Sequence, residues 1–423
     1  MSRPRTWVAV VCLLPVVAPA PASAQAAAPA MPLTIEQAVR EAVDHNLSVV
    51  AERYNLAVAD ARVLTASLRP NPVLTASAML PDATIYNSNV NPKEGIVRGD
   101  VLIERGGKRE RRIDVAQQAR GVTELQLQNT VRALTLNVQS AFIDVQQAQS
   151  DLQLARESLA AFNEIVAINT ERVRSGDLAS VELARSRLAA LQFQNDVRSR
   201  EAKLAAARHR LRALLGRSDA EPIEVAGELR RDGAGMRPDA LQAQAFQLRP
   251  DLKALERDQA RSSADVRLQL AQGKIDYTVS AEFHRQAAPG SLTGNEWGLF
   301  LSAPIPIFNR NQGEAERARQ EARQAAARIA ALQSDITSEL RSAWDRFTTA
   351  RELVDTIEQQ MLAQARDVRD TTAYSYRGGE ASFIELLDAQ RTFNETMQSY
   401  NEARAEYARS LYTLDALTGG ARP

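Results

Sequence analysis

One long stretch free of proline decides the fold of this chain. Residues 108 to 180 read KRERRIDVAQQARGVTELQLQNTVRALTLNVQSAFIDVQQAQSDLQLARESLAAFNEIVAINTERVRSGDLAS. Ala, Leu, Gln, Arg and Glu dominate this stretch and all favour helices, so a helix is predicted from Lys108 to Arg174. At a rise of 1.5 Å per residue it would span about 100 Å, which is longer than a globular domain is wide. The turn Ser175-Gly176-Asp177 then predicts a return helix that ends near Gly216.

Proline positions mark where such helices cannot run, because proline breaks helix interiors. None lies between Pro92 and Pro222, and none lies between Pro306 and Pro423. The second interval therefore predicts another long helical hairpin, which turns at Gly378-Gly379-Glu380. On its return helix, apolar side chains recur at steps typical of a coiled-coil seam, namely Phe393, Met397, Tyr400, Tyr407, Leu411, Leu414 and Leu417.

The two hairpins belong to an internal duplication. Identical residues recur at one constant offset over nearly the whole length, and the pairs include Ala61/Ala264, Val63/Val266, Ser77/Ser280, Gly176/Gly379, Glu182/Glu385 and Leu183/Leu386. Such self-similarity indicates two copies of one structural unit. We therefore predict a first repeat over 25–216, a connector rich in Gly, Asp and Pro over 217–236, and a second repeat over 237–423.

Each repeat begins with a helical pattern, over 35–69 and 241–272, and the hydrophobic period then changes to two. In the second repeat Ile275, Tyr277, Val279, Ala281 and Phe283 alternate with polar residues, and in the first Leu74, Ala76, Ala78 and Leu80 occupy the matching positions. A further strand follows in each repeat, near 97–103 and 297–303. The alternation places Val279 and Phe283 on one face, and Thr278 and Ser280 on the other.

Four strands cannot close a membrane barrel, because the smallest such barrels have about eight strands and an open edge in lipid leaves backbone groups unsatisfied. The chain must therefore oligomerise or lie outside a membrane. A dimer would supply eight strands and a trimer twelve, and the residues alone do not choose between them.

The first residues predict export. Arg3 and Arg5 precede an apolar run from Trp7 to Ala18, and Ala22-Ser23-Ala24 is a small-residue cleavage pattern, so residues 1–24 are predicted to be a signal peptide. The only cysteine, Cys12, lies within it. The chain has 52 basic and 52 acidic residues, and loss of the leader leaves a slightly acidic protein without the basic excess of a nucleic-acid binder.

These features together resemble the TolC family of outer-membrane channel proteins. The most specific match is the second tip hairpin, with Tyr376, Gly379, Glu385, Leu386, Leu387, Asp388, Ala389 and Gln390. Two other segments, Gly106-Gly107-Lys108-Arg109 and Pro304 to Gly313, look like the branch that serves heavy-metal cation pumps of the cobalt-zinc-cadmium type.

The resemblance implies a mainly α protein with a small β part. Three chains would form one twelve-stranded β-barrel in the outer membrane of a Gram-negative bacterium, continued by an α-helical barrel across the periplasm. Such ducts join a periplasmic adaptor protein and an inner-membrane, proton-driven pump of the RND type. They contact outer-membrane lipid, bind no cofactor and catalyse no reaction.

The tips carry the candidate aperture. Gly176 and Gly379 mark the turns, and threefold symmetry would arrange Glu182, Glu385 and Asp388 as carboxylate rings that favour cations. Alternatively these acids are solvated residues near helix starts, where negative charge suits the helix dipole.

Tyr376 matches a family tyrosine that helps to hold the aperture closed. Ala381 stands where drug-exporting relatives carry an arginine, so the closing network cannot be transferred whole. Arg377 or Arg174 could replace that arginine, and simple packing of Tyr376 against a neighbouring helix is the alternative.

A basic run, Lys108, Arg109, Arg111 and Arg112, follows the Gly-Gly turn. It would suit anionic phospholipid headgroups at the periplasmic rim of a barrel. The alternative is a solvated helix start with its cations paired to Glu110 and Asp114.

No metal-binding motif or catalytic motif is present. His45, His209 and His284 are far apart in sequence, and there is no G-x-S-x-G, P-loop or H-E-x-x-H. The resemblance thus implies an efflux duct for heavy-metal cations, and the lack of a metal-binding motif indicates that the cations pass through a wet pore without stopping. A duct for drugs or other organic molecules is the alternative within transport, and a periplasmic coiled-coil tether without a pore is the alternative of another class.

Overall fold

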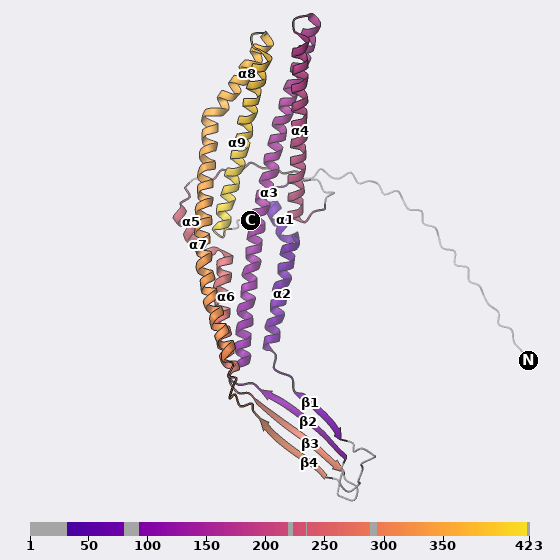
Figure 1. Ribbon diagram of the computed structural model, residues 1–423, viewed down its shortest axis with the longest axis vertical. Helices are drawn as coiled ribbons and strands as arrows, with labels where there is room; N and C mark the ends of the chain where they lie inside the picture. The colour runs from indigo at the N-terminus through magenta and orange to yellow at the C-terminus, as the bar shows by residue number, and fades with distance from the viewer. Residues whose placement is uncertain (1–31, 80–92, 219–222, 234, 288–293, 421–423) are drawn as a thin grey trace, which may run out of the picture.

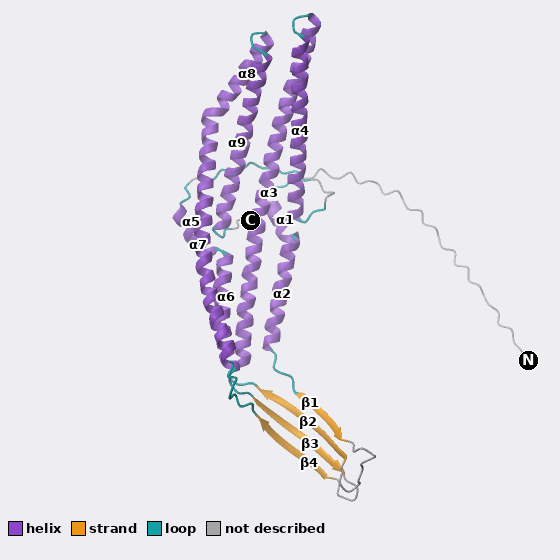
Figure 2. Cartoon of the chain, in the orientation of Figure 1, coloured by secondary structure: helices purple, strands orange, loops and turns teal. Residues whose placement is uncertain are grey.

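The computed structural model describes residues 32–79, 93–218, 223–233, 235–287 and 294–420. Long helices run nearly parallel along the molecule, and a small sheet lies at one end of them (Figures 1 and 2). The predicted signal peptide and Leu80 lie outside the described residues. The mainly α architecture with a small β part is confirmed.

The sheet has four antiparallel strands in the order β1-β2-β3-β4. They are β1 (Val73–Met79), β2 (Lys93–Ile103), β3 (Tyr277–Ala287) and β4 (Gly294–Ser302). The predicted pair of strands in each repeat is confirmed, although β2 and β4 begin earlier than the alternation suggested. Gly95 and Gly99 weaken the strand signal of β2, but pairing with β1 and β3 on its two sides outweighs their low propensity.

The register gives the sheet one apolar and one mainly polar face. The apolar face carries Leu74, Ala76, Ala78, Val97, Val101, Ile103, Tyr277, Val279, Ala281, Phe283, Trp297, Leu299 and Leu301, with the polar residues Lys93, Arg285 and Asn295 confined to one end of it. Trp297 and Leu299 are 80% and 86% exposed. The other face carries Thr75, Ser77, Glu94, Arg98, Asp100, Thr278, Ser280, Glu282, His284, Gln286 and Glu296, together with Ile96, Leu102 and Phe300. The predicted separation of Val279 and Phe283 from Thr278 and Ser280 is therefore confirmed.

Helix α3 (Lys108–Ser175) is the spine of the molecule, with 68 residues. Towards the sheet, neighbouring helices pack in the order α2, α3, α6, α7; towards the tips the order is α4, α3, α9, α8. The other bounds are α1 (Ile35–His45), α2 (Leu47–Ser67), α4 (Ser180–Leu215), α5 (Pro238–Leu248), α6 (Pro250–Gln272), α7 (Gln312–Thr356), α8 (Leu362–Gly378) and α9 (Phe383–Leu417). Among the described residues, no helix is both long enough and apolar enough to cross a membrane.

Two predicted helices are each split in two. Asn46 is extended between α1 and α2, where its side chain accepts a hydrogen bond from the Ser48 amide and its Nδ2 donates to the Leu214 carbonyl. Arg249 is extended between α5 and α6 because the residue before a proline disfavours helical angles, and Pro250 starts the new helix.

The second long hairpin also departs from the prediction of an unbroken helix. A π-helical turn, η1 (Ile357–Met361), lies between α7 and α8. Glu358 in this turn accepts hydrogen bonds from Tyr400 of α9 at 2.5 Å and from Arg231 of the connector at 2.7 Å. No proline or glycine marks the site, so the sequence carries no local signal for it.

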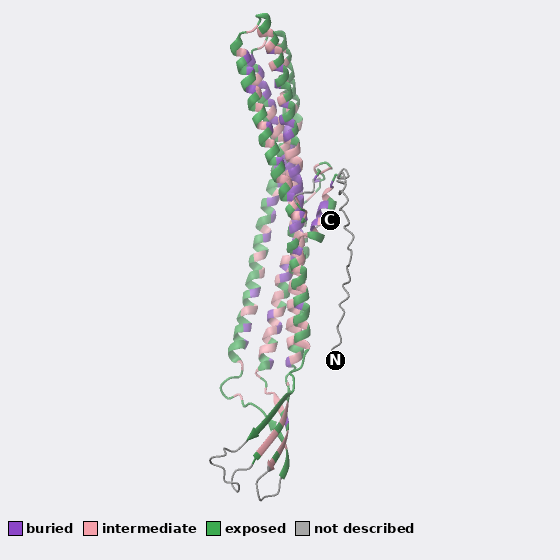
Figure 3. Ribbon diagram, turned by 90° about the vertical axis from the view of Figure 1, so that its right-hand side faces the viewer, coloured by how far each residue is buried: buried purple, intermediate pink, exposed green. Residues whose placement is uncertain are grey.

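The core consists of separate clusters along the helices, because a structure this narrow has no single centre (Figure 3). One cluster joins α1, α3 and α4 around Phe142 and Leu211, and another joins α7, η1 and α9 around Phe347 and Leu411. Most side chains of the sheet are exposed or half-buried.

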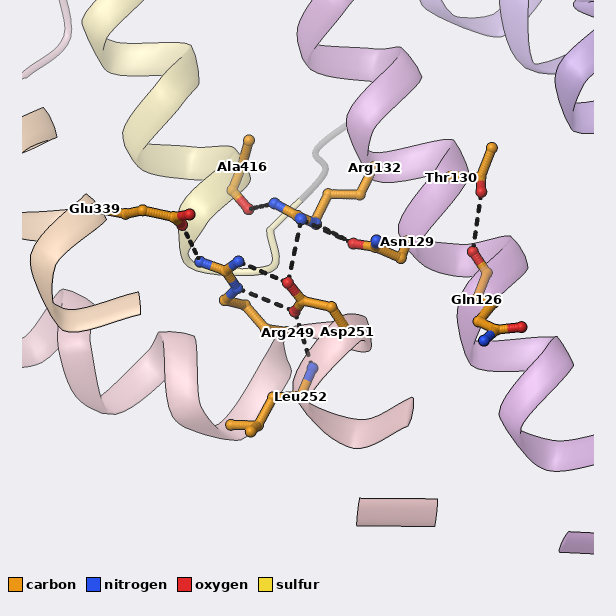
Figure 4. Close-up of polar contacts among 9 residues, drawn as sticks. All are labelled: Gln126, Asn129, Thr130, Arg132, Arg249, Asp251, Leu252, Glu339 and Ala416. Atoms are coloured by element: carbon orange, nitrogen blue, oxygen red, sulfur yellow. Dashed lines mark hydrogen bonds and ion pairs between the residues drawn. The ribbon is translucent and has the colours of Figure 1, made fainter. Parts of the chain in front are cut away.

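A buried cluster of charges joins helices of both repeats at mid-length (Figure 4). Arg249 donates to Asp251 at 2.6 Å and to Glu339 of α7 at 2.9 Å. Arg132 of α3 lies 3.7 Å from Asp251 and donates to the Ala416 carbonyl at 2.9 Å. Burial opposes the charged form of Asp251, but the hydrogen bonds from Arg249 outweigh it and lower the pKa of the carboxyl. Its contribution to stability is therefore present above the ordinary pKa and is lost as the pH falls through the lowered value.

Replacing Arg249 with leucine should reduce the free energy of unfolding by about 3 kcal/mol, because it leaves the half-buried Asp251 without its main partner. Arg351→Leu is the matched control, since Arg351 pairs with Asp355 at 3.9 Å on the surface and should cost less than about 1 kcal/mol. Denaturant unfolding followed by helical circular dichroism measures the two losses. Equal losses would show that the Arg249 cluster is no more important than a surface pair.

Candidate functional site

The two hairpin tips turn at the predicted glycines. Gly176 and Gly379 adopt left-handed angles, with φ of 87° and 85°, and each ends a long helix. At these angles a side chain would be strained. A Cβ on Gly379 would also lie 3.1 Å from a guanidinium nitrogen of Arg172, so the second tip sits against the first hairpin.

Tyr376 is buried between the two hairpins. Its hydroxyl donates to Oδ1 of Asn169 in α3 at 2.8 Å, and its ring packs edge-on against Phe383. Burial raises the pKa of the Tyr376 hydroxyl, so it stays a neutral hydrogen-bond donor. Packing and a hydrogen bond are therefore combined at this residue, where the sequence analysis had offered them as alternatives.

Sequence reasoning missed two residues of this network, Asn169 and Arg172. Arg172 donates to the Tyr376 carbonyl at 3.3 Å. The arginines considered from the sequence lie elsewhere, since Arg174 pairs with Glu171 and Arg377 with Glu164. A signal for Asn169 did exist, because a polar residue follows Phe162 and Ile165 on the apolar seam of α3.

The three tip acids have different environments. Glu385 accepts hydrogen bonds from the backbone amide and hydroxyl of Ser382 at 2.7 and 2.9 Å. These two hydrogen bonds, and above all the one from the backbone amide, lower the pKa of the Glu385 carboxyl. It thus completes a capping box at the start of α9. Glu182 forms an ion pair with Arg185 at 2.8 Å. Asp388 is exposed. Glu385 and Asp388 lie three residues apart on α9 and so share one face of that helix, and a ring formed by several chains remains a prediction.

The basic run lies where the strands meet the helices, and most of its members bind inside the protein. Lys108 is buried and donates to Asp276 at 2.6 Å and to the Lys274 carbonyl at 2.8 Å. Arg109 donates to the Ser67 carbonyl at the end of α2, and Arg112 makes a double ion pair with Glu104.

These contacts change the interpretation of the run. Glu110 and Asp114 are not its main partners, because Asp114 pairs with Arg267 of α6 at 2.8 Å. Arg111 is exposed. Lys108, Arg109 and Arg112 instead fix the sheet onto α2 and α3, and Asp276 brings the second repeat into the same junction.

The family model described as outer membrane efflux protein matches residues 38–217 and again 241–420. The two matches overlap the two segments predicted as repeats, 25–216 and 237–423. This family is one of channels rather than a class of enzyme.

Curated relatives agree with this assignment. The cobalt-zinc-cadmium resistance protein CzcC of Cupriavidus metallidurans is 24% identical over 92% of this chain and 90% of its own length. The cation efflux system protein CusC of Escherichia coli is 24% identical over 61% of this chain and 58% of its own length.

Solved structures show the same fold. The channel CusC superposes with a TM-score of 0.77 at 18% identity, covering 92% of each chain. The outer-membrane channel OprN gives a TM-score of 0.76 at 21% identity over 92% of this chain and 90% of its own.

The resemblance inferred from the tip and junction motifs is thus confirmed at the level of sequence and of fold. Because one family model accounts for both halves and most of the length, the protein belongs to the outer membrane efflux protein family, and it is a duct of the outer membrane that extends into the periplasm.

Proposed function

We propose that three copies of this chain form one continuous duct. The proposal rests on the fact that both the sheet and the row of helices have two unpaired edges. Among the described residues, the outer edges of β1 and β4 pair with no strand, and α2 and α7 lie at the two ends of a row of helices. Head-to-tail contacts between copies would close both rows into a ring, and three copies would supply the twelve strands of the barrel. A monomeric mass for the detergent-extracted protein would contradict this arrangement.

In such a ring the apolar face of the sheet faces lipid and the polar face lines the lumen. Trp297, Leu299 and Leu301 are exposed on one face, and Glu94, Glu282 and Glu296 lie on the other. An antiparallel sheet with a solvated face and an apolar face suits a barrel wall between water and hydrocarbon. The acidic residues give the lumen a preference for cations.

We propose that the cargo consists of heavy-metal cations, delivered by an inner-membrane RND-type pump through a periplasmic adaptor protein. Support comes from the relative named for cobalt, zinc and cadmium resistance, which matches along nearly the whole chain. The acidic polar face of the sheet agrees with a cationic cargo. The same observations favour cations over drugs, and the pore-forming fold argues against a simple tether.

Deleting the gene from a bacterium that carries it should lower the tolerated concentrations of Co²⁺, Zn²⁺ or Cd²⁺ several-fold, because export from the periplasm then stops. Growth assays measure this tolerance, and the intact gene supplied on a plasmid should restore it. Unchanged metal tolerance together with increased sensitivity to an organic cation such as ethidium would contradict a metal cargo.

We also propose that Tyr376 and Asn169 hold the tip closed. The hydrogen bond between them joins α8 to α3, and Arg172 adds a second link to the Tyr376 carbonyl. If the second hairpin swings outward when the duct opens, both contacts must break. The network takes the place of the arginine that Ala381 replaces.

Tyr376→Phe should therefore raise the ratio of open to closed tips about fivefold for each chain of the channel, since a hydrogen bond contributes about 1 kcal/mol and the ring packing is retained. Planar-bilayer recordings measure this ratio. Tyr374→Phe is the matched control, because Tyr374 lies two residues away with its side chain 78% exposed. Identical open fractions in all three proteins would exclude the proposed closing role.

Asp388 is the tip acid best placed to select ions, because Glu385 is occupied by its capping contacts and Glu182 by Arg185. Asp388→Asn should move the reversal potential in a salt gradient towards zero. Glu385→Gln is the control: glutamine also completes a capping box, and its effect should be smaller. A reversal potential unchanged by Asp388→Asn would show that this carboxylate is merely solvated.

A further inference from the structure

Three acid or imidazole side chains that are distant in sequence meet at the far end of the sheet's polar face. His284 of β3 lies directly across from Glu296 of β4, and Glu94 of β2 is on the same face one diagonal step away. His284 Nε2 is 3.7 Å from Glu94 Oε2, and His284 Nδ1 is 3.8 Å from Glu296 Oε2. The strands carry these residues near the ends of β3 and β4 that lie away from the helices (Figure 1).

The distance between His284 Nε2 and Glu94 is too long for a hydrogen bond. It does leave room for an ion between the two atoms, because nitrogen and oxygen ligands each lie about 2.1 Å from a zinc ion. His284 Nε2 is buried and has no hydrogen-bond partner. A buried ring nitrogen without a partner costs free energy, and an ion bound there would satisfy it.

We propose that His284 Nε2 and Glu94 form a binding site for divalent transition-metal cations in the lumen of the duct. The proposal rests on the proposed function as a metal exporter, and it identifies where the cargo pauses near the exit. Imidazole with carboxylate is a ligand pair that suits Zn²⁺, Co²⁺, Ni²⁺ and Cu²⁺ better than Mg²⁺ or Ca²⁺.

Neighbouring side chains are placed to support the two ligands. Glu296 Oε2 lies 3.8 Å from the other ring nitrogen of His284, beyond hydrogen-bond distance, and its negative charge there favours the tautomer with the proton on Nδ1, which leaves Nε2 free for a metal. Gln286 donates to Glu94 Oε1 at 3.0 Å and so orients that carboxylate. The nearby cation Arg98 is bound to Asp100 at 2.8 Å and to Ser280 at 3.0 Å, which directs its charge away from the site.

The proposed site should bind metal ions weakly, because it has only two protein ligands. In the described part of the chain no group of three His, Cys, Asp or Glu side chains is arranged to hold a metal ion, so water fills the remaining positions around a cation bound by these two ligands. Weak binding suits a duct, because an ion must enter the site and also leave it. A pause at His284 replaces the expectation from sequence that the cargo meets no ligand.

Zinc titration of the purified, detergent-solubilised protein tests the proposal by isothermal calorimetry. The intact protein should bind one Zn²⁺ per chain, and His284→Asn and Glu94→Gln should each weaken the affinity more than tenfold. Glu296→Gln should weaken it less than either ligand substitution does, because Glu296 lies 3.8 Å from Nδ1 and acts only through its charge. His209→Asn is the matched control, because it removes an exposed histidine on α4 and should leave the affinity unchanged.

Pulsed electron paramagnetic resonance with Cu²⁺ gives a second readout, which detects the coordinating imidazole directly and does not depend on a measured affinity. The intact protein should show coupling of the copper electron to the remote nitrogen of an imidazole, and the signal should persist in His209→Asn and vanish in His284→Asn. Equal zinc affinities in the intact protein and His284→Asn, or an imidazole signal that survives in His284→Asn, would overturn the site. The growth assay stays independent of these results: metal tolerance that depends on the gene, with no zinc bound at His284, rejects the site and leaves the proposed function standing.

Discussion

Backbone hydrogen bonding at the two edges of the sheet is the constraint on which the rest of the molecule depends. Every strand N–H and C=O that faces lipid must have a partner, because hydrocarbon offers none. Within one chain β2 and β3 satisfy each other and their neighbours, whereas β1 and β4 each present an outer edge. The helices repeat the same geometry, since α2 and α7 end their row as β1 and β4 end theirs. The sheet in the membrane and the helices in water must therefore both pair their edges with another copy of the chain, although they share no secondary structure.

Polar side chains decide how the two repeats are held together. Lys108 with Asp276 joins them at the base of the helices, Arg132 with Asp251 joins them at mid-length, and Tyr376 with Asn169 joins them at the tip. Each contact pairs a residue of one repeat with a residue of the other, or bridges them through α3. Apolar clusters also join the repeats, as where Phe162 and Ile165 pack with Phe383 and Leu386 at the tip, but they are separate from one another along the helices. Ion pairs and hydrogen bonds therefore help to align the two repeats, because their geometry is specific.

Much of the architecture could be predicted from the sequence because its signals are long or repeated. The helix of α3, the tips at Gly176 and Gly379, and four strands all follow from proline spacing, glycine turns and a period of two. The break at Asn46 and the π turn at Ile357–Met361 could not be predicted, since each depends on contacts with distant residues such as Leu214 and Arg231. For the same reason the partners of Tyr376 and Lys108 were missed or misassigned, and His284 was treated as isolated although Glu94 and Glu296 lie beside it. Spacing along the chain shows which residues share a helix face or a strand face. It does not show which residues of β2, β3 and β4 lie opposite one another, because that register is seen only in the folded sheet.

The pairing of β2 with β3 also sets an order of events during biogenesis. Residues 93–103 must find residues 277–287, so the centre of the sheet joins segments that emerge far apart in time during export. Hairpin α3–α4 is complete within the first half and can form early from local contacts, whereas β1 and β2 alone make only a two-stranded ribbon, which is marginal in water. Until the second half arrives, the apolar side chains of β1 and β2 are exposed to the periplasm, which makes this half-made sheet the stage most exposed to aggregation and to proteases. A cell that makes this duct therefore needs periplasmic chaperones chiefly for its smallest part.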